Sequence, residues 1–426
     1  YYWSRSDPVA GKRHLDAALR YAEGVTERER LMIQGKAAEW RGDRESAATA
    51  YRTLAEQYPN DDIAWGNLAY QQMRLSRTDE AANSYRRVLE LDSLDANALI
   101  NLATVYALEG EHTRANEHYR RAFRVAPGYR TSTGILHEYG LNLVHLGRIE
   151  EAERVYREWT EDESAALRAQ GLRSTAMIRF LQGRFRDAEE LLRRAIVLNR
   201  STNAVTSEVR NRGFLIEARF RRGAPIDDEL SEAVRLAVDN YVPSYWVHHI
   251  GVWLARAGRT AEAATLVDSA RARVDQADRT RAAVMRLEAE LALARQDETT
   301  AIDRLQASST VEPDWRLPTA ALAELRRRRG ELEAAESLLH DVLGSPDHAP
   351  GDEGQVEWVL ARYRLARIQE RLGRVDEARE NYERFLAFWA EGDPGLVQVT
   401  TARDRLRALA EPRAAPAAAA EPPPRR

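Results

Sequence analysis

The sequence predicts an all-α protein, built as an α-solenoid of about ten stacked helix-turn-helix units. Its 426 residues are rich in Ala, Leu, Glu and Arg, which favour helices, and contain few of the β-branched residues that favour sheets. Nearly the same phrase also recurs along the chain: GRIEEAERVY begins at residue 147, GRFRDAEELL at 183, GRTAEAATLV at 258 and GRVDEARENY at 373. A recurring phrase of this kind indicates a repeated structural unit rather than a catalytic motif.

Aligning the repeats on the alanine at the sixth position of this phrase gives nine anchors. The first three anchors are 34 residues apart, and later intervals run from 34 to 43 residues, apart from one gap of 75 residues between Ala188 and Ala263. That gap covers about two periods, so we expect a tenth, degenerate unit there, with its second helix near residues 228–238. The anchors are Ala47, Ala81, Ala115, Ala152, Ala188, Ala263, Ala301, Ala335 and Ala378.

Each unit carries the residues needed to pack two helices closely. A small residue lies 12 positions before the anchor, and small side chains on facing helices allow the two backbones to approach. A large residue four positions after the anchor lies on the same helix face and fills the space beside the crossing. The turn between the helices often contains glycine, which readily adopts the left-handed conformation that ends a helix. The first-helix small residues are Gly35, Ala69, Ala103, Gly140, Ala176, Gly251, Ala289, Ala323 and Ala366.

Between residues 65 and 127 the chain resembles the tetratricopeptide repeat. The matching positions are Trp65, Leu68, Ala69, Ala81 and Tyr85, then Leu102, Ala103, Tyr106, Ala115, Tyr119, Ala122 and Pro127. The likeness extends over roughly residues 28–390. This region is similar to the tetratricopeptide arrays of bacterial scaffold and signalling proteins. It implies a right-handed superhelix in which the first helix of every pair lines a concave, peptide-binding face.

We divide the chain into six segments on this basis. The predicted segments are a stub and capping helix at 1–27, repeat units 1–5 at 28–200, the degenerate unit at 201–243, units 7–10 at 244–390, a C-terminal capping helix at 391–410 and a tail at 411–426. The capping helix is expected because the last pair would otherwise expose an apolar face. The Ala/Pro-rich tail is predicted to be disordered, because its composition cannot build a core.

Two stretches depart from the repeat pattern. RRGAPIDDEL, at residues 221–230, interrupts the degenerate unit, and GSPDHAPGDEGQVEW, at 344–358, lengthens a connection. Either could kink the array or divide it into subarrays. These stretches are also where an enzyme would have its active site, in segment 201–243 or in segment 344–358. An enzyme is the weakest of the three functional hypotheses that we consider.

Composition and motifs argue against most other functions. The chain has no cysteine, which excludes disulfides and thiolate metal sites, and its 63 basic and 67 acidic residues create no overall attraction to nucleic acid. Adjacent His248 and His249 would point about 100° apart on a helix, while His137 and His145 lie two turns apart, so we interpret these residues as groove-lining or surface histidines. No nucleotide-binding glycine loop or nucleophile elbow occurs. We therefore expect no catalytic residue, no metal site, no cofactor and no nucleic-acid partner.

The candidate binding residues lie on the predicted concave face. Asn67, Asn101 and Asn211 each precede a first-helix small residue by two positions, where an amide can both donate to and accept from a peptide backbone. This is similar to the asparagine ladder of some tetratricopeptide proteins. The full candidate set is Asn67, Tyr70, Asn101, Thr104, His137, Arg173, Met177 and Asn211. The residues also expected to face inward are Leu141, Val252, Glu290, Glu324 and Arg367, which would make the wall charged towards the C-terminus.

We predict a non-enzymatic scaffold that binds a protein or peptide on this face. The alternative is the C-terminal sensory or regulatory array of a longer bacterial signalling protein, such as a Ser/Thr kinase or a cyclase. Residues 14–43 resemble the segment that begins such arrays, and the chain starts without Met. Tyr1, Tyr2 and Trp3 are typical of the interfacial end of a membrane helix. No apolar stretch within the chain is long enough to cross a bilayer, so we expect a soluble segment, either cytoplasmic or tethered through residues upstream of Tyr1.

A bacterial origin is indicated by the basic residues. Lysine occurs only at Lys12 and Lys36, and arginine accounts for the rest. Together with the abundance of alanine, this bias is typical of a GC-rich genome.

Overall fold

The computed structural model describes residues 8–131, 133–240, 242, 244–272, 278–313, 315–344 and 355–410. These ranges contain helices and turns and no β-strand, as the sequence predicts. Three features of the sequence lie outside the described residues. They are the aromatic residues at 1–3, residues 345–354 of the long connection, and the tail at 411–426. The chain forms two compact units, residues 1–156 (unit 1) and 157–426 (unit 2), and each is described by itself.

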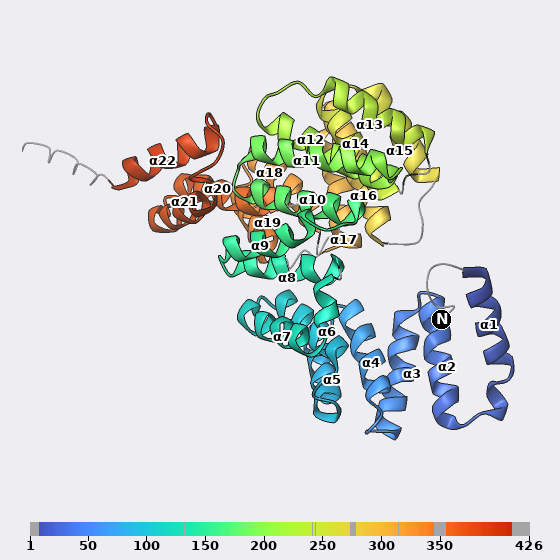
Figure 1. The fold of residues 1–426 in the computed structure, drawn as a ribbon. Coiled ribbons are helices and arrows are strands. Elements are labelled where there is room, and N and C mark those ends of the chain that lie inside the picture. Colours follow the sequence, from blue (N-terminus) through green and yellow to red (C-terminus); the bar gives the residue numbers. More distant parts are fainter. Residues whose placement is uncertain are drawn as a thin grey trace, which may run out of the picture. The chain divides into compact units, whose positions relative to one another are not determined.

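Unit 1 consists of helix pairs joined by short turns (Figure 1). It begins with α1 (Pro8–Arg20) and the 3-10 turn η1 (Ala22–Gly24). The pairs that follow are α2 (Glu27–Trp40) with α3 (Arg44–Gln57), α4 (Asp62–Arg74) with α5 (Thr78–Leu91), and α6 (Ala96–Leu108) with α7 (His112–Val125). After the 3-10 turn η2 (Pro127–Thr131) come α8 (Thr133–His145) and α9 (Ile149–Thr160), the last of which continues into unit 2.

The described residues of unit 2 form six further pairs and a final single helix. The pairs are α10 (Ala165–Leu181) with α11 (Phe185–Ser201), α12 (Val205–Arg221) with α13 (Asp227–Asp239), α14 (Ser244–Arg256) with α15 (Thr260–Ala272), α16 (Asp278–Ala294) with α17 (Glu298–Val311), α18 (Arg316–Arg328) with α19 (Leu332–Gly344), and α20 (Gln355–Arg371) with α21 (Val375–Trp389); the single helix is α22 (Val397–Ala410). The irregular segment 201–243 therefore forms an ordinary pair, α12 and α13, in its described part.

Aspartate and threonine side chains determine where several of these helices begin. Asp61 and Asp95 accept hydrogen bonds from the backbone N–H groups three residues ahead, at 3.1 and 2.8 Å, and so satisfy donors that the first turn of α4 or α6 leaves unpaired. At α2, Thr26 and Glu29 cap each other's backbone reciprocally. These local bonds fix the starts of the first helices α2, α4 and α6.

Close packing of small and large residues holds the pairs together. Every anchor alanine is fully buried, and so is Ala233 in α13, the corresponding residue of the tenth pair. The Tyr51 ring lies so near the backbone of Gly35 that a Cβ on that glycine would overlap it, and Tyr156 lies in the same way against Gly140. The Tyr156 hydroxyl also donates to the carbonyl of His137 at 3.0 Å. Glycine at these crossings leaves room for the tyrosine ring, which fills the space between the helices.

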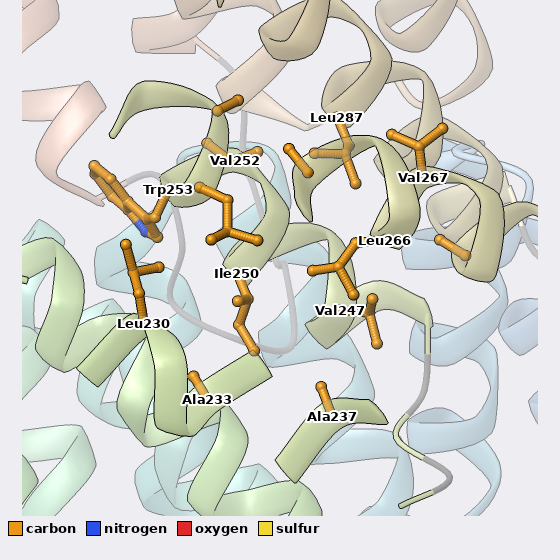
Figure 2. Packing of buried hydrophobic residues seen from close by; sticks show 14 of the residues in the cluster. Leu230, Ala233, Ala237, Val247, Ile250, Val252, Trp253, Leu266, Val267 and Leu287 are labelled. Atoms are coloured by element: carbon orange, nitrogen blue, oxygen red, sulfur yellow. The ribbon is translucent and has the colours of Figure 1, made fainter. Parts of the chain in front are cut away.

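A continuous hydrophobic core joins consecutive pairs in unit 2. Figure 2 shows Ile250 and Trp253 of α14 next to Leu230 of α13, with Leu266 of α15 and Leu287 of α16 on the other side. All five side chains are buried. Because α14 packs against α12, α13, α15 and α16, its position is fixed from several directions. This packing holds the helices in the middle of unit 2 together.

Unit 2 also turns back on itself, so that its first pair contacts its last. Helix α10 contacts α20, and Trp389 at the end of α21 packs edge-on against Phe185 in α11, with ring centroids 5.4 Å apart. Asp393, which follows α21, accepts a hydrogen bond from the backbone N–H of Arg186 at 2.9 Å. Its own N–H donates to the carbonyl of Gly183, also at 2.9 Å. We call the contacts of Trp389 and Asp393 with residues 183–186 the clasp.

Candidate functional site

Five of the eight predicted binding residues lie on the first helices of unit 1. Tyr70, on α4, is 46 % exposed, which is unusual for a large aromatic side chain in this structure. Asn67 on the same helix is half-buried, and its Oδ1 accepts a hydrogen bond from Lys36 Nζ at 3.1 Å. Asn101, on the neighbouring helix α6, is also half-buried. Helices α4 and α6 contact each other, so we assign Tyr70 and Asn101 to one candidate wall.

Thr104 and His137 are more involved in packing. The Thr104 hydroxyl lies 3.1 Å from that of Tyr119 and donates to the carbonyl of Ile100 at 3.2 Å. His137, on α8, is half-buried, and its ring stacks on Tyr156 at a centroid distance of 6.2 Å. Both side chains therefore contribute to the helix crossings as well as to the wall.

The other three predicted residues belong to unit 2 and are buried. Arg173 and Met177 are 6 % and 3 % exposed on α10, the helix that α20 covers when unit 2 turns back on itself. Asn211, on α12, has no exposed surface, and its Nδ2 donates to Asn199 Oδ1 in α11 at 2.7 Å. The structure thus does not bring the eight residues together on one exposed face. We accordingly restrict the proposed peptide-binding wall to Asn67, Tyr70, Asn101, Thr104 and His137.

Five first helices in the described part of unit 2 line a cavity of about 820 Å³, which we call the lumen. Residues of α12, α14, α16, α18 and α20 line the lumen, together with Gln398 of α22. Its charged residues are the arginines at positions 221, 256, 286, 327, 328, 364 and 367 and the glutamates at positions 217, 290, 324 and 357. The sequence predicts inward-facing positions for Glu290, Glu324 and Arg367, and all three line the lumen. The sequence does not predict that these positions line one cavity.

Buried ion pairs form the floor of the lumen. Glu357 accepts hydrogen bonds from Arg221 Nη2 at 3.0 Å and from Arg364 Nη1 at 2.6 Å. Burial alone would raise the pKa of Glu357, but the two guanidinium groups outweigh burial and hold this pKa well below its usual range. Glu290 is paired in the same way with Arg256, which also lowers its pKa. These carboxylates therefore stay ionised near neutral pH.

A buried histidine lies among these charges. Burial, followed by the positive charges of Arg286 and Arg256, lowers the pKa of His249 to about 3. The Glu217 carboxylate lies close to it, with Oε2 4.0 Å from His249 Nε2. Arg221 already neutralises Glu217, with Nη2 and Oε1 2.6 Å apart. His249 is consequently neutral in the folded protein across the physiological pH range.

We predict that His249 makes stability depend on pH below neutrality. Its folded pKa of about 3 lies below the value of about 6.5 in an unfolded chain, so the unfolded state binds more protons between these values. The free energy of unfolding should therefore fall by up to about 1.4 kcal/mol per pH unit as the pH drops below 6.5. Urea unfolding at pH 7.5, 6.5 and 5.5 would measure this slope. His249→Gln should remove the slope, and parallel pH profiles for the two proteins would contradict the prediction.

In the described part of the chain, no group of three or more His, Cys, Asp and Glu side chains is arranged to hold a metal ion. None of the helices there combines the length and the apolar character needed to cross a lipid bilayer.

Family models described as tetratricopeptide repeat match four segments of the chain. One matches residues 67–129 and 140–203, and a second matches residues 31–61 and 360–389. These segments include helix pairs of both units.

Curated relatives match shorter regions. The chain is 40% identical over 75 residues to the anaphase-promoting complex subunit CDC16 of Saccharomyces cerevisiae, covering 18% of this chain and 9% of that protein. It is 27% identical over 146 residues to the type IV pilus assembly protein PilF of Pseudomonas aeruginosa, covering 34% of this chain and 57% of PilF. The chain thus spans less than two thirds of each of these relatives.

Solved structures with similar folds cover more of the chain at low identity. A tetratricopeptide repeat protein from Parabacteroides merdae aligns with 70% of this chain and 98% of its own, at 16% identity and a TM-score of 0.44. Yeast Tom70 aligns with 92% of this chain and 96% of its own, at 13% identity and a TM-score of 0.42. The matched segments and the observed helix pairs show that the chain contains tetratricopeptide repeats.

Proposed function

We propose that the chain is a non-enzymatic scaffold that binds an extended segment of a partner protein on the peptide-binding wall of unit 1. The observation that carries this proposal is the exposure of Tyr70 on the first helix α4, which contacts the first helix α6 that carries the half-buried Asn101. Tyr70 is 46 % exposed and Asn101 keeps part of its surface exposed, so both are available to a ligand.

The chemistry of this wall suits a peptide backbone. An asparagine amide can donate to a peptide carbonyl and accept from a peptide N–H, and such bonds do not depend on the peptide's side chains. Tyr70 adds a broad apolar ring with a hydroxyl at its edge, a common anchor in protein interfaces. The bond from Lys36 to Asn67 restrains the second amide before any ligand arrives. Restraint of this kind lowers the entropy lost on binding.

Two further observations support a scaffold rather than an enzyme. The buried carboxylates Glu290 and Glu357 have lowered pKa values, so they are poor general acids near neutral pH. Two relatives are described as a subunit of the anaphase-promoting complex and as a pilus assembly protein, names that refer to multiprotein assemblies. A sensory array in a longer signalling protein would use the same wall, and the coding sequence upstream of Tyr1 would distinguish that alternative.

Peptide display against the whole chain would test the proposal. We expect selection of peptides that bind the wild type and that bind at least tenfold more weakly to the double variant Tyr70→Ala/Asn101→Ala. The matched control is Tyr21→Ala/Asn83→Ala, which removes an exposed tyrosine and an exposed asparagine outside the first helices of unit 1. Isothermal titration calorimetry would give both affinities. Equal binding by the wild type and the Tyr70/Asn101 variant would rule out the proposed wall.

A further inference from the structure

We propose that the lumen of unit 2 is a second binding site, for a small organic anion that carries several negative charges and an aromatic group. The site lies in a different unit from the peptide-binding wall and uses none of its residues. The proposal therefore does not depend on whether unit 1 binds peptides.

The lumen carries an excess of positive charge. The lining residues include seven arginines and four glutamates, and His249 is neutral, so their formal net charge is +3. A concave wall of one net sign concentrates the electric field and attracts ligands of the opposite sign.

The excess charge is greatest near the C-terminal ends of α18 and α20. Glu324 is shared by two arginines: Arg327 donates to it at 2.9 and 2.7 Å, and Arg328 at 3.1 Å. Arg367 donates to the Tyr363 hydroxyl at 3.1 Å, and no carboxylate in the described part of the chain lies within 4.0 Å of its guanidinium. Arg328 and Arg367 are both exposed. A phosphate or carboxylate ligand can therefore reach both guanidinium groups, whose planar fork matches the geometry of either anion.

The floor beneath these arginines would strengthen the attraction. Glu290 and Glu357 are held by Arg256, Arg221 and Arg364, so the buried carboxylates present little net negative charge to a ligand. Charges that interact in a partly enclosed, low-dielectric site are less weakened by water and salt than charges on an open surface.

An exposed aromatic ring indicates the second part of the ligand. Phe220, at the end of α12, is 42 % exposed although it lines the lumen. Its ring centroid lies 5.0 Å from that of Trp253, which is buried. A bare inorganic anion would leave this apolar surface in water, whereas an aromatic group stacked on Phe220 would cover it. The lumen volume of about 820 Å³ is within the usual range for sites that bind small molecules.

Two kinds of molecule share this chemistry. A nucleotide combines phosphates with a planar base, and a short acidic peptide can combine carboxylates with an aromatic side chain. Calorimetry on the whole chain, without divalent cations and at an ionic strength of about 0.15 M, would distinguish them. The four probes are ATP, inorganic triphosphate, adenosine and the blocked peptide Glu-Glu-Phe-Glu-Glu.

We expect ATP or the peptide to bind with one-to-one stoichiometry, and whichever of them binds identifies the source of the anion. Triphosphate and adenosine should each bind at least tenfold more weakly than ATP if the nucleotide is the ligand, since each carries only half of the required chemistry. Failure of both ATP and the peptide to bind would overturn the proposal. So would triphosphate binding as tightly as ATP, because the aromatic wall would then contribute nothing.

Variants would locate the bound probe. Arg328→Gln/Arg367→Gln should weaken binding by about tenfold to a hundredfold, which is the usual effect of losing hydrogen bonds to a charged group. Phe220→Ala should weaken binding of the aromatic probe and leave triphosphate unchanged. The matched controls are Arg384→Gln and Val197→Ala, at exposed positions outside the lumen, and both should bind as the wild type does. An equal loss of affinity in Arg384→Gln would show non-specific attraction and overturn the assignment.

The double variant Tyr70→Ala/Asn101→Ala separates this proposal from the one for unit 1. It should lose the selected peptides and keep the lumen ligand, while Arg328→Gln/Arg367→Gln should show the reverse. Loss of the lumen ligand in the Tyr70/Asn101 variant would contradict two independent sites.

Discussion

Replacing Glu357 with alanine is expected to destabilise unit 2 by about 3 kcal/mol. The Glu357 side chain is 15% exposed and receives hydrogen bonds from Arg221 of α12 and Arg364 of α20. Its removal leaves two largely buried guanidinium groups short of a partner. Breaking a buried pair typically costs about 3–5 kcal/mol, and we expect the lower end because Glu217 still pairs with Arg221.

Urea unfolding followed by circular dichroism would measure this loss. Glu380→Ala is the matched control, because Glu380 pairs with Arg384 on the surface, where both side chains are about 60% exposed. Surface pairs of this kind contribute between about 0 and 1 kcal/mol. If the two substitutions destabilise the chain equally, the Glu357 pairs do not hold α12 and α20 together.

Replacing Gly183 with alanine is expected to cost about 2–4 kcal/mol, the second large effect. Gly183 has a φ angle of +68°, which strains any residue with a Cβ. The added Cβ would also lie 2.9 Å from Cδ2 of Trp389, whose ring is fully buried in the clasp. Both the turn and the packing of Trp389 would have to adjust.

Gly373→Ala separates these two contributions. Gly373 occupies the equivalent turn between α20 and α21 with a φ angle of +78°, and nothing lies within 4 Å of its would-be Cβ. This control should show the backbone strain alone, about 1–2 kcal/mol. Thermal melting of both variants gives the difference, which measures the contact with Trp389. Identical losses would mean that the clasp contributes nothing to stability.

The helix pairs could be predicted because their determinants are close together in the sequence. A small residue at the anchor, a large residue one turn later and a cap at the helix start act within a few residues, and the burial of all nine anchor alanines follows from that pattern. The interrupted segment around Ala233 also forms a pair, although Arg221 stands 12 positions before Ala233 and Ala237 stands four positions after it. Two turns without glycine, at Ser76 and Gln296, adopt the same left-handed conformation.

The lumen could not be predicted in the same way. Whether a stack of pairs closes depends on the small rotation between neighbouring pairs, and such rotations add up over the whole of unit 2. Arg221 and Glu357 are 136 residues apart, and no local pattern relates them. The positions of Glu290, Glu324 and Arg367 on their helices predict that they face inward. These positions do not predict that all three line the same cavity. The sequence places Asn211 on the peptide-binding face, whereas in the structure its amide pairs with the buried amide of Asn199. An asparagine can form either kind of contact, so its position in the repeat does not distinguish them.

The clasp has a consequence for how unit 2 unfolds. In an open array the terminal repeat contacts one neighbour and can fray independently of the rest. In unit 2, fraying of α21 and α22 must also break bonds to residues such as Arg186, 207 positions earlier than Asp393. Forming that contact requires closure of a long loop, whose entropy must be lost before the bonds form. Unit 2 should therefore open cooperatively, whereas the linear stack of unit 1 can lose its helix pairs one at a time.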